Sequence, residues 1–383
     1  MIQSPPATRV ALLAALAGAV VCALGAVTQP MAFWPTWTTA TVFWVGAAIG
    51  CLAIGLLHPL SGGNWGWGMG RELHAGLGVM PVMGLALLVL GLGAPHVYPW
   101  AQESAHETLN PNQFRFLAPQ YVLLRTVVSW VLWSGMAYWL VRNFFLGAPR
   151  GLFMASARLA AFGMIALWLT ASFAAIDGIM AITPGWSSSL FGMLQIVGFA
   201  GTGMSLLIIM RYAVKRDTLT DPEQTGVTHD LGNLLLAFTM VWSYLAFSQY
   251  LIIWSGDLPQ EVSWYVDRRT SGWKAVAIAL ILFHFVAPLA LLVSRDVKRH
   301  PKRLALVAGL ILAMQLVDHV WTILPSFHET GVMSFVYLAA SWVTLGGLWW
   351  NAVGRLWKRL PEVNLAVAFA DDPLEAAQPE KVT

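Results

Sequence analysis

Several ionisable and hydroxyl side chains lie inside, or at the ends of, long apolar stretches of this sequence. His284 is near the middle of one stretch, and Asp318 and His319 lie within the next. An imidazole titrates near neutral pH, and an ionisable group surrounded by lipid is costly, so such residues are candidates for moving protons. The candidate proton pathway comprises His58, Asp177, Tyr244, His284, Asp318 and His319.

A second polar group lies where apolar stretches meet their connecting loops, and it comprises Arg71, Glu72, His74, His229 and Asp230. Two interpretations are open for both groups. In the functional one, two titratable clusters form half-channels on opposite faces of the membrane, joined by the central His284. In the structural one, the residues cap helix ends and form ion pairs, with Arg125 pairing with Asp177.

The elements that must position these residues are membrane-spanning helices. An α-helix needs about 20 apolar residues to cross a bilayer, and hydrophobic residues make up 57% of this chain against 11% charged. The apolar runs are continuous, which favours helices over alternating barrel strands. The predicted spans are 10–27, 38–58, 73–92, 119–141, 155–179, 188–210, 230–254, 272–294, 304–324 and 331–353.

The sequence therefore predicts an all-α integral membrane protein with about ten transmembrane helices. Residues 1–354 form a single polytopic domain, and residues 355–383 form a short cytoplasmic tail. Most of the 22 Lys and Arg residues fall in alternate loops, on the same side as both termini. This positive-inside pattern predicts cytoplasmic termini. The net charge of +3 then reflects topology and does not favour binding to nucleic acid. A cleaved signal peptide over the first span is the alternative there.

The residue types exclude several kinds of redox and phosphate chemistry. Cys22 and Cys51 both lie inside predicted spans, so we expect neither a disulfide nor an iron–sulfur cluster. No second His is predicted at the depth of His284, which argues against haem, and the sequence has no phosphate-binding loop of the GxxxxGK[ST] type. We expect this chain to bind no cofactor itself.

Several segments together resemble the F subunit of bacterial alternative complex III, a respiratory quinol oxidoreductase. They extend in order from about residue 55 to about residue 350, and the third is the most specific. The segments are HPLSGGNWG (His58–Gly66) with Arg71, SFAAIDGIMAITP (Ser172–Pro184), DLGNLLLAFTMVWSYLAFSQYLIIW (Asp230–Trp254), LPQEVSWYVDRR (Leu258–Arg269), and His284 to Trp321 with SRDVKRHPKRL and LVDHVW.

The resemblance implies two four-helix bundles plus two flanking helices, related to the membrane anchors of polysulfide reductase-like enzymes. It implies a bacterial inner-membrane location and contact with lipid. It also implies three kinds of partner: a C-type quinol-binding membrane subunit, a cytochrome c subunit and an iron–sulfur subunit. Haem and iron–sulfur clusters would lie in those partners, and quinol would bind at or near this chain. The matching polar positions are His58, Arg71, Asp177, His284 and Asp318.

The chain also departs from the family pattern. Thr183 and Gly185 stand where the family usually has an Asp and a His around Pro184. Asn233 replaces a usual Lys, and Gly70 replaces one of a usual Arg pair. The outer half of the expected proton path is therefore less polar than in typical members.

The function expected from the residues and the resemblance is that of a non-redox subunit of a respiratory quinol:electron-acceptor oxidoreductase. The chain would be no enzyme on its own, and would be structural with a proton-conducting role. Two alternatives are open. One is a quinone- or quinol-binding subunit with His58 or His74 as proton acceptor. The other is a free-standing secondary transporter, for which the mid-span prolines Pro81 and Pro288 are weak support.

Overall fold

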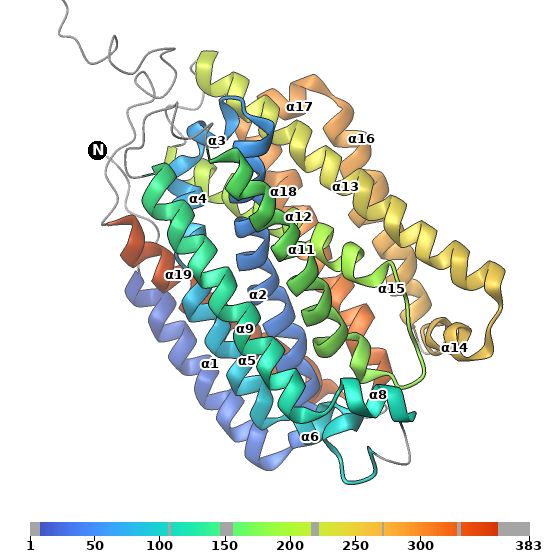
Figure 1. The fold of residues 1–383 in the computed structure, drawn as a ribbon. Helices are drawn as coiled ribbons and strands as arrows, with labels where there is room; N and C mark the ends of the chain where they lie inside the picture. Colours follow the sequence, from blue (N-terminus) through green and yellow to red (C-terminus); the bar gives the residue numbers. More distant parts are fainter. Residues whose placement is uncertain are drawn as a thin grey trace, which may run out of the picture.

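The computed structural model describes residues 8–105, 109–145, 156–215, 222–269, 272–327 and 331–358. Every regular element among these residues is a helix, and the long helices run side by side (Figure 1). Nine helical segments in the described part are long and apolar enough to cross a membrane. The tenth long helix, Pro119–Leu140, is less apolar because it carries Arg125 and several Ser, Tyr and Trp residues. The predicted class, an all-α integral membrane protein of about ten helices, is confirmed.

The long helices correspond one to one with the predicted spans. They are α1 (Thr8–Thr28), α2 (Pro30–Ser61), α4 (Gly70–Leu77) continued by α5 (Met80–Leu92), α9 (Pro119–Leu140), α11 (Ala157–Gly178), α12 (Phe191–Lys215), α13 (Pro222–Gly256), α15 (Trp273–Ala279) continued by η4 (Leu280–Val286) and α16 (Ala287–Val293), α18 (Pro301–Ile323) and α19 (Val332–Trp357). Several begin with proline, which is well suited to a first helical position because the amide there needs no intrahelical partner.

Short elements lie between the long helices and turn the chain at the bundle ends. They are α3 (Trp65–Gly68), α6 (Ala94–Val97), η1 (Pro99–Ala101), α8 (Pro111–Phe116), η2 (Val141–Phe145), η3 (Met180–Ile182), α14 (Pro259–Asp267), α17 (Arg295–Arg299) and η5 (Leu324–Ser326). We call the bundle end at which α1 begins and α19 ends the terminal face, and the opposite end the distal face. Figure 1 shows α3 and α17 at the terminal face, and α6, α8 and α14 at the distal face. Residues 359–383 of the predicted tail lie outside the described residues.

The long helices form two groups of four that meet along α2 and α12. The first group contains α2, α5, α9 and α11, and the second contains α12, α13, η4 with α16, and α18. Helices α2 and α12 are the most enclosed of the long helices that the structure describes. They pack on each other, and α11, α5 and α19 cover other sides of α2. The arrangement of two four-helix bundles with two flanking helices, α1 and α19, is therefore present.

Helix α1 packs along α19 through small residues. A Cβ atom on Gly18 would lie 2.5 Å from Thr344 Oγ1, and one on Gly25 would lie 2.7 Å from the Tyr337 ring. Cys22 Sγ lies 3.6 Å from Ser341 Oγ. Such close backbone approach is typical of paired helices in membranes.

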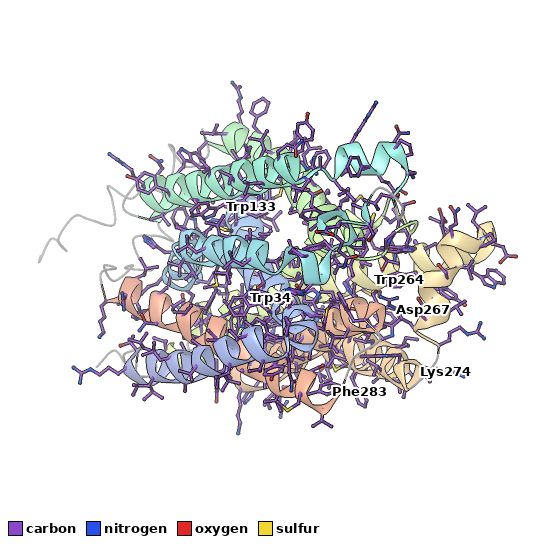
Figure 2. All side chains as sticks on the ribbon, turned by 90° about the horizontal axis from the view of Figure 1, so that it is seen from below. Trp34, Trp133, Trp264, Asp267, Lys274 and Phe283 are labelled. Atoms are coloured by element: carbon purple, nitrogen blue, oxygen red, sulfur yellow. The ribbon has the colours of Figure 1, made fainter. Side chains whose placement is uncertain are left out.

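The sides of the bundle are apolar, and charged side chains gather at its ends. Figure 2 shows Trp264, Asp267 and Lys274 together near one end of the molecule, whereas Phe283 points outward from its side. Half of the Phe283 surface is exposed. The apolar sides provide the surface that contacts lipid.

Arg268 fastens the distal face by bonding to the last turn of α18. Its guanidinium donates to the carbonyl oxygens of Trp321 (3.1 Å), Thr322 (2.6 Å) and Trp264 (2.7 Å). It also lies 3.5 Å from the centre of the Trp264 ring, which stacks on Trp186 at 4.7 Å. Carbonyls in the last turn of a helix have no intrahelical partner, and a cation there also favours the helix dipole. Arg268 therefore holds α14 onto α18.

We expect Arg268→Leu to destabilise the protein by roughly 2–4 kcal/mol, because it leaves buried carbonyl groups without donors. The neighbouring Arg269 is exposed, so Arg269→Leu is the matched control and should change stability little. Thermal unfolding of the detergent-solubilised variants measures the difference. Equal midpoints for the two variants would contradict the assigned role.

Candidate functional site

A buried group of polar side chains joins three helices of the second bundle. This group, here called the His–Asp cluster, contains Trp242, His284, Gln315, Asp318 and His319. The ring of Trp242 on α13 lies 4.0 Å from that of His284 on η4, measured between centroids. Asp318 accepts hydrogen bonds from Gln315 Nε2 at 3.4 Å and from the Trp242 side chain. His284 and His319 are also close enough to interact electrostatically. The predicted residues His284, Asp318 and His319 thus come together.

The cluster is sealed from solvent by aromatic and aliphatic neighbours. Asp318 is 7% exposed and His319 is 1% exposed. The His319 ring lies 6.3 Å from that of Phe43 and 5.9 Å from that of Phe199, between centroids. Within the described residues, neither ring nitrogen of His319 has a hydrogen-bond partner, and nor does Nδ1 of His284. A buried polar atom without a partner is costly, so its retention calls for a reason.

A distortion of the helix positions His284. The residue lies in η4, a π-helical segment, where the amide of Ala287 donates to the carbonyl of Leu282 five residues earlier. Pro288 follows directly and has no amide hydrogen, and in a regular α-helix its ring would clash with the carbonyl of His284. The wider turn removes this conflict. Single π turns inside α-helices occur frequently at functional sites.

The first bundle holds a carboxylate in a different way. Arg125 on α9 binds Asp177 on α11 through two hydrogen bonds, Nε to Oδ2 at 2.7 Å and Nη2 to Oδ1 at 2.8 Å. Arg125 also donates to the carbonyl of Phe116 at 2.9 Å. This bidentate ion pair confirms the pairing predicted in the structural interpretation. Asp177 is buried and fully compensated, whereas Asp318 has no cation beside it among the described hydrogen bonds and ion pairs.

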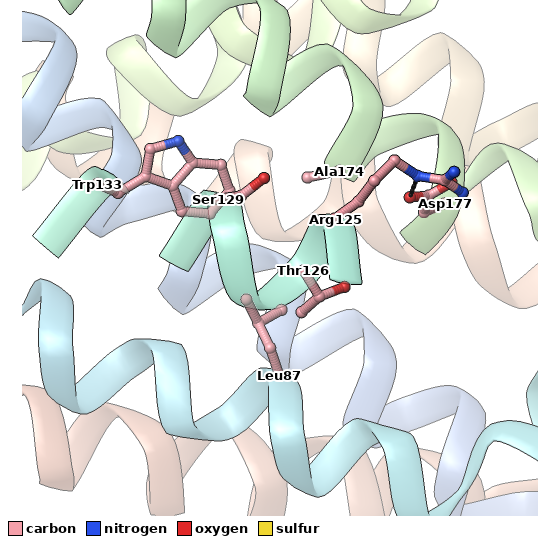
Figure 3. Close-up of a pocket in the computed structure, with 7 residues that line it drawn as sticks. All are labelled: Leu87, Arg125, Thr126, Ser129, Trp133, Ala174 and Asp177. Carbon is pink, nitrogen blue, oxygen red and sulfur yellow. Dashed lines mark hydrogen bonds and ion pairs between the residues drawn. The ribbon is translucent and has the colours of Figure 1, made fainter. Parts of the chain in front are cut away.

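A small cavity lies beside the ion pair, between α5, α9 and α11 (Figure 3). Its volume is about 30 Å³, which is enough for about two water molecules. Figure 3 shows Arg125 and Asp177 joined at one side of it. The lining residues are Leu87, Arg125, Thr126, Ser129, Trp133, Ala174 and Asp177.

The two carboxylates occupy corresponding places in the two bundles. Asp177 lies near the end of α11 and Asp318 near the end of α18, and each is followed by a proline seven residues later, Pro184 or Pro325. A short 3-10 turn follows each helix, η3 or η5. These helices are the last of their respective groups of four. The repeated Asp and Pro spacing is a sequence signal that could have revealed the repeat.

The same correspondence extends to the third helix of each group. Arg125 comes from that helix in the first bundle and His284 from that helix in the second. The turns that follow α11 and α18 also contact each other, since Thr183 Oγ1 lies 3.1 Å from Ser326 Oγ. One bundle therefore pairs its carboxylate with a permanent cation. The other binds it through the side chain of Trp242, whose ring also contacts the titratable imidazole of His284.

His58 lies at the terminal face, enclosed by the loop that follows it. Its Nε2 lies 3.2 Å from the carbonyl oxygen of Gly63, and its ring packs edge-on against Trp65 at 4.9 Å and Trp67 at 5.4 Å. A Cβ atom on Gly66 would lie 2.2 Å from the ring. The loop therefore folds back onto the bundle. Because His58 is 1% exposed, it offers no room for the close approach of about 3 Å that a quinol hydroxyl would need.

The other terminal-face candidates divide between two places. Arg71 donates to the carbonyl of Trp357 at 3.1 Å, and Glu72 and His74 are buried on the same short helix, α4. Glu72 interacts electrostatically with the buried Arg211 of α12. Arg211 also donates to the Gly68 carbonyl and to Gln224.

His229 and Asp230 lie elsewhere, on the first part of α13, and Nδ1 of His229 lies 3.8 Å from the Asp230 carboxylate. Lys298, from α17, donates to Asn233 at 2.8 Å. The Lys298–Asn233 bond joins α17 to α13, and none of these contacts leads towards His284.

Tyr244 lies apart from the His–Asp cluster. It is two residues beyond Trp242, about 200° around the helix, and its side chain is 69% exposed. The residues that sequence reasoning missed are Trp242, Gln315 and Arg211. Arg211 was counted among loop charges, and the other two have no charge that would single them out.

No group of three or more His, Cys, Asp or Glu side chains in the described ranges is arranged to hold a metal ion. The described part of the chain is thus that of a multi-pass membrane protein, with the His–Asp cluster buried in the second bundle and an ion-paired carboxylate in the first. Comparison with protein-family models and with curated proteins finds no match to this chain.

Proposed function

We propose that this chain is a non-redox membrane subunit of a respiratory quinol oxidoreductase in a bacterial inner membrane, with cytoplasmic termini, and that its His–Asp cluster passes protons. The resemblance of the sequence to the F subunit of alternative complex III supports the complex and its partners. The observation that carries the proton role is the sealed group of Asp318, His284 and His319. Ionisable residues at membrane depth are rare and generally functional.

The chemistry of the cluster suits proton transfer between neighbours. Asp318 is held by neutral donors, Gln315 and Trp242, so its carboxylate can accept a proton without breaking an ion pair. His284 and His319 each carry a ring nitrogen that no described group occupies. A proton can therefore reside on an imidazole or on the carboxylate, and Trp242 contacts both His284 and Asp318.

The proposal gives Asp177 a structural role. Its carboxylate accepts two hydrogen bonds from Arg125. Protonating the carboxylate would leave the partly buried guanidinium charge without its counter-ion. The transporter alternative gains no support, because the irregular segments in the middle of long helices, the α4–α5 junction and η4, occupy different positions in their groups of four, and the π-helical η2 lies at the end of α9. Matching broken helices in the two halves would be expected of that class.

The test uses the assembled complex in proteoliposomes, with electron transfer and proton translocation measured together. Asp318→Asn retains the acceptor oxygen and the size of the side chain but cannot ionise. We expect it to lower proton translocation about tenfold or more while assembly is retained, and His284→Ala to act in the same direction. His229→Gln, a change to a part-exposed imidazole of α13, should leave translocation unchanged.

Two results would overturn the proposal, each at a different level. If Asp318→Asn and His284→Ala both translocate protons as the unaltered complex does, the cluster carries no protons. If the tagged chain purifies from its native membrane without cytochrome or iron–sulfur subunits, as mass spectrometry would reveal, it is not part of such a complex.

A further inference from the structure

One exposed face of the bundle carries a tyrosine hydroxyl far from either end of its helix, on α13. Exposed side chains follow one side of α13, at spacings of four, three, four and three residues: Met240, Tyr244, Phe247, Leu251 and Trp254. This spacing places them on a single helix face. The exposed large hydrophobic side chains of α1 and α11 are instead Val, Leu, Ile and Phe. Hydrocarbon faces of that kind suit lipid tails.

The Tyr244 hydroxyl lies deep in the membrane layer. Trp242, two residues earlier, contacts His284, which is the twelfth residue of the 21-residue span Trp273–Val293. Tyr244 is therefore within a few ångströms of the mid-depth of that span. The hydrocarbon core extends about 15 Å to either side of its centre, so the phenol cannot reach the headgroup region. Tyrosines normally exposed to lipid lie at the two interfaces, where the hydroxyl is hydrated.

No described group of this chain is hydrogen-bonded to the Tyr244 hydroxyl. The other exposed tyrosines in the described spans lie nearer to helix ends: Tyr121 and Tyr138 near the two ends of α9, and Tyr250 in the last two turns of α13. Tyr138 also accepts a hydrogen bond from Arg142 at 3.1 Å. A polar group facing lipid tails with no partner costs free energy. The Tyr244 hydroxyl is thus the exposed polar group at this depth that a binding partner would satisfy.

We propose that this face of α13 is the docking surface for a transmembrane helix of a different membrane subunit. That helix carries small residues opposite the large side chains and a hydrogen-bond acceptor at the depth of Tyr244. A second copy of this chain would bring rings against rings, because the face has no small residue between Met240 and Trp254, whereas membrane helices pair closely through small residues. The Tyr244 hydroxyl, unpaired among the described residues, indicates that a partner helix binds here. The identity of that partner, a subunit of the respiratory complex, rests on the proposed function.

The experiment places the photoreactive amino acid p-benzoylphenylalanine at Phe247, beside Tyr244, in the full chain in native membranes. The matched control carries it at Phe162, which is as exposed but lies on the hydrocarbon face of α11. We expect one discrete protein adduct from position 247, with the linked peptide in a spanning segment of another subunit, and lipid adducts only from position 162. Adding Tyr244→Phe should lower the protein adduct about threefold, the usual worth of one interhelical hydrogen bond.

Lipid adducts alone from position 247, or an adduct with a second copy of this chain, would overturn the inference. The proposed function fails differently. If the adduct is another membrane protein but no cytochrome or iron–sulfur subunit co-purifies, the docking surface stands and the respiratory role does not. If those subunits co-purify and position 247 reacts only with lipid, the respiratory role stands and the docking surface does not.

Discussion

Replacing Gly50 by valine is expected to prevent the two four-helix groups from meeting, and so to abolish recovery of folded protein. A Cβ atom on Gly50 of α2 would lie 1.9 Å from the carbonyl oxygen of Phe199 on α12. The reciprocal atom on Gly203 would lie 2.6 Å from the Gly50 carbonyl carbon. Both obstacles are backbone atoms, so no side chain can move aside to relieve the clash. We therefore expect Gly50→Val to destabilise the protein by more than the roughly 1–3 kcal/mol of ordinary overpacking.

The matched control for Gly50→Val is Gly135→Val. Gly135 is a mid-helix glycine of α9, and a Cβ atom there meets nothing within 4 Å. It should fold at the normal yield. The measurement is the monodisperse fraction after detergent extraction and size-exclusion chromatography. Normal recovery of the Gly50 variant would mean that α2 and α12 do not approach as described.

Removing the carboxylate of Asp177 has the second largest expected effect. Asp177→Ala leaves Arg125 without its partner inside the bundle, and breaking such a pair typically costs about 3–5 kcal/mol. The double variant Arg125→Leu/Asp177→Leu removes both charges and should recover most of that loss, because a packed apolar pair avoids the desolvation cost. Thermal unfolding of the two single variants and the double variant gives the coupling between the side chains.

The double variant also decides between the two interpretations of Asp177. If the pair is structural, the double variant assembles and the complex translocates protons normally. If Asp177 carries protons, translocation is lost although stability returns. Equal destabilisation in Asp177→Ala and in the double variant would show instead that the pair contributes nothing as a pair.

The helices were predictable because each needs only a continuous apolar run, which is a local property of the sequence. The rotation of each helix about its own axis, which decides the side chains that face inward, could not be predicted. Helix α13 is apolar on every side, so no periodicity shows that Trp242 faces inward and Tyr244 outward. Tyr244 was consequently grouped with His284, from which the structure separates it.

The assembly of the candidate site depended on tertiary packing in the same way. The sequence shows Asp318 and His319 together, but bringing them to His284 requires α13, η4 and α18 to meet and η4 to open by one residue. The Arg125–Asp177 pair could be predicted because both residues lie inside predicted spans, near the ends that face the same side of the membrane. Arg211 and Arg268 were assigned to loops on charge alone, although both are buried and hold short helices to long ones.

The difference between the two carboxylate sites has a consequence for the response to membrane voltage. The Arg125–Asp177 pair carries no net charge, so an electric field across the bilayer exerts no net force on it. A proton arriving on His284 or His319 would instead add a whole elementary charge part-way through that field. Such a charge changes its free energy by about 2.3 kcal/mol for each 100 mV that it crosses. A membrane voltage would therefore shift the protonation of the imidazoles in the second bundle, whereas it would exert no net force on the ion pair in the first.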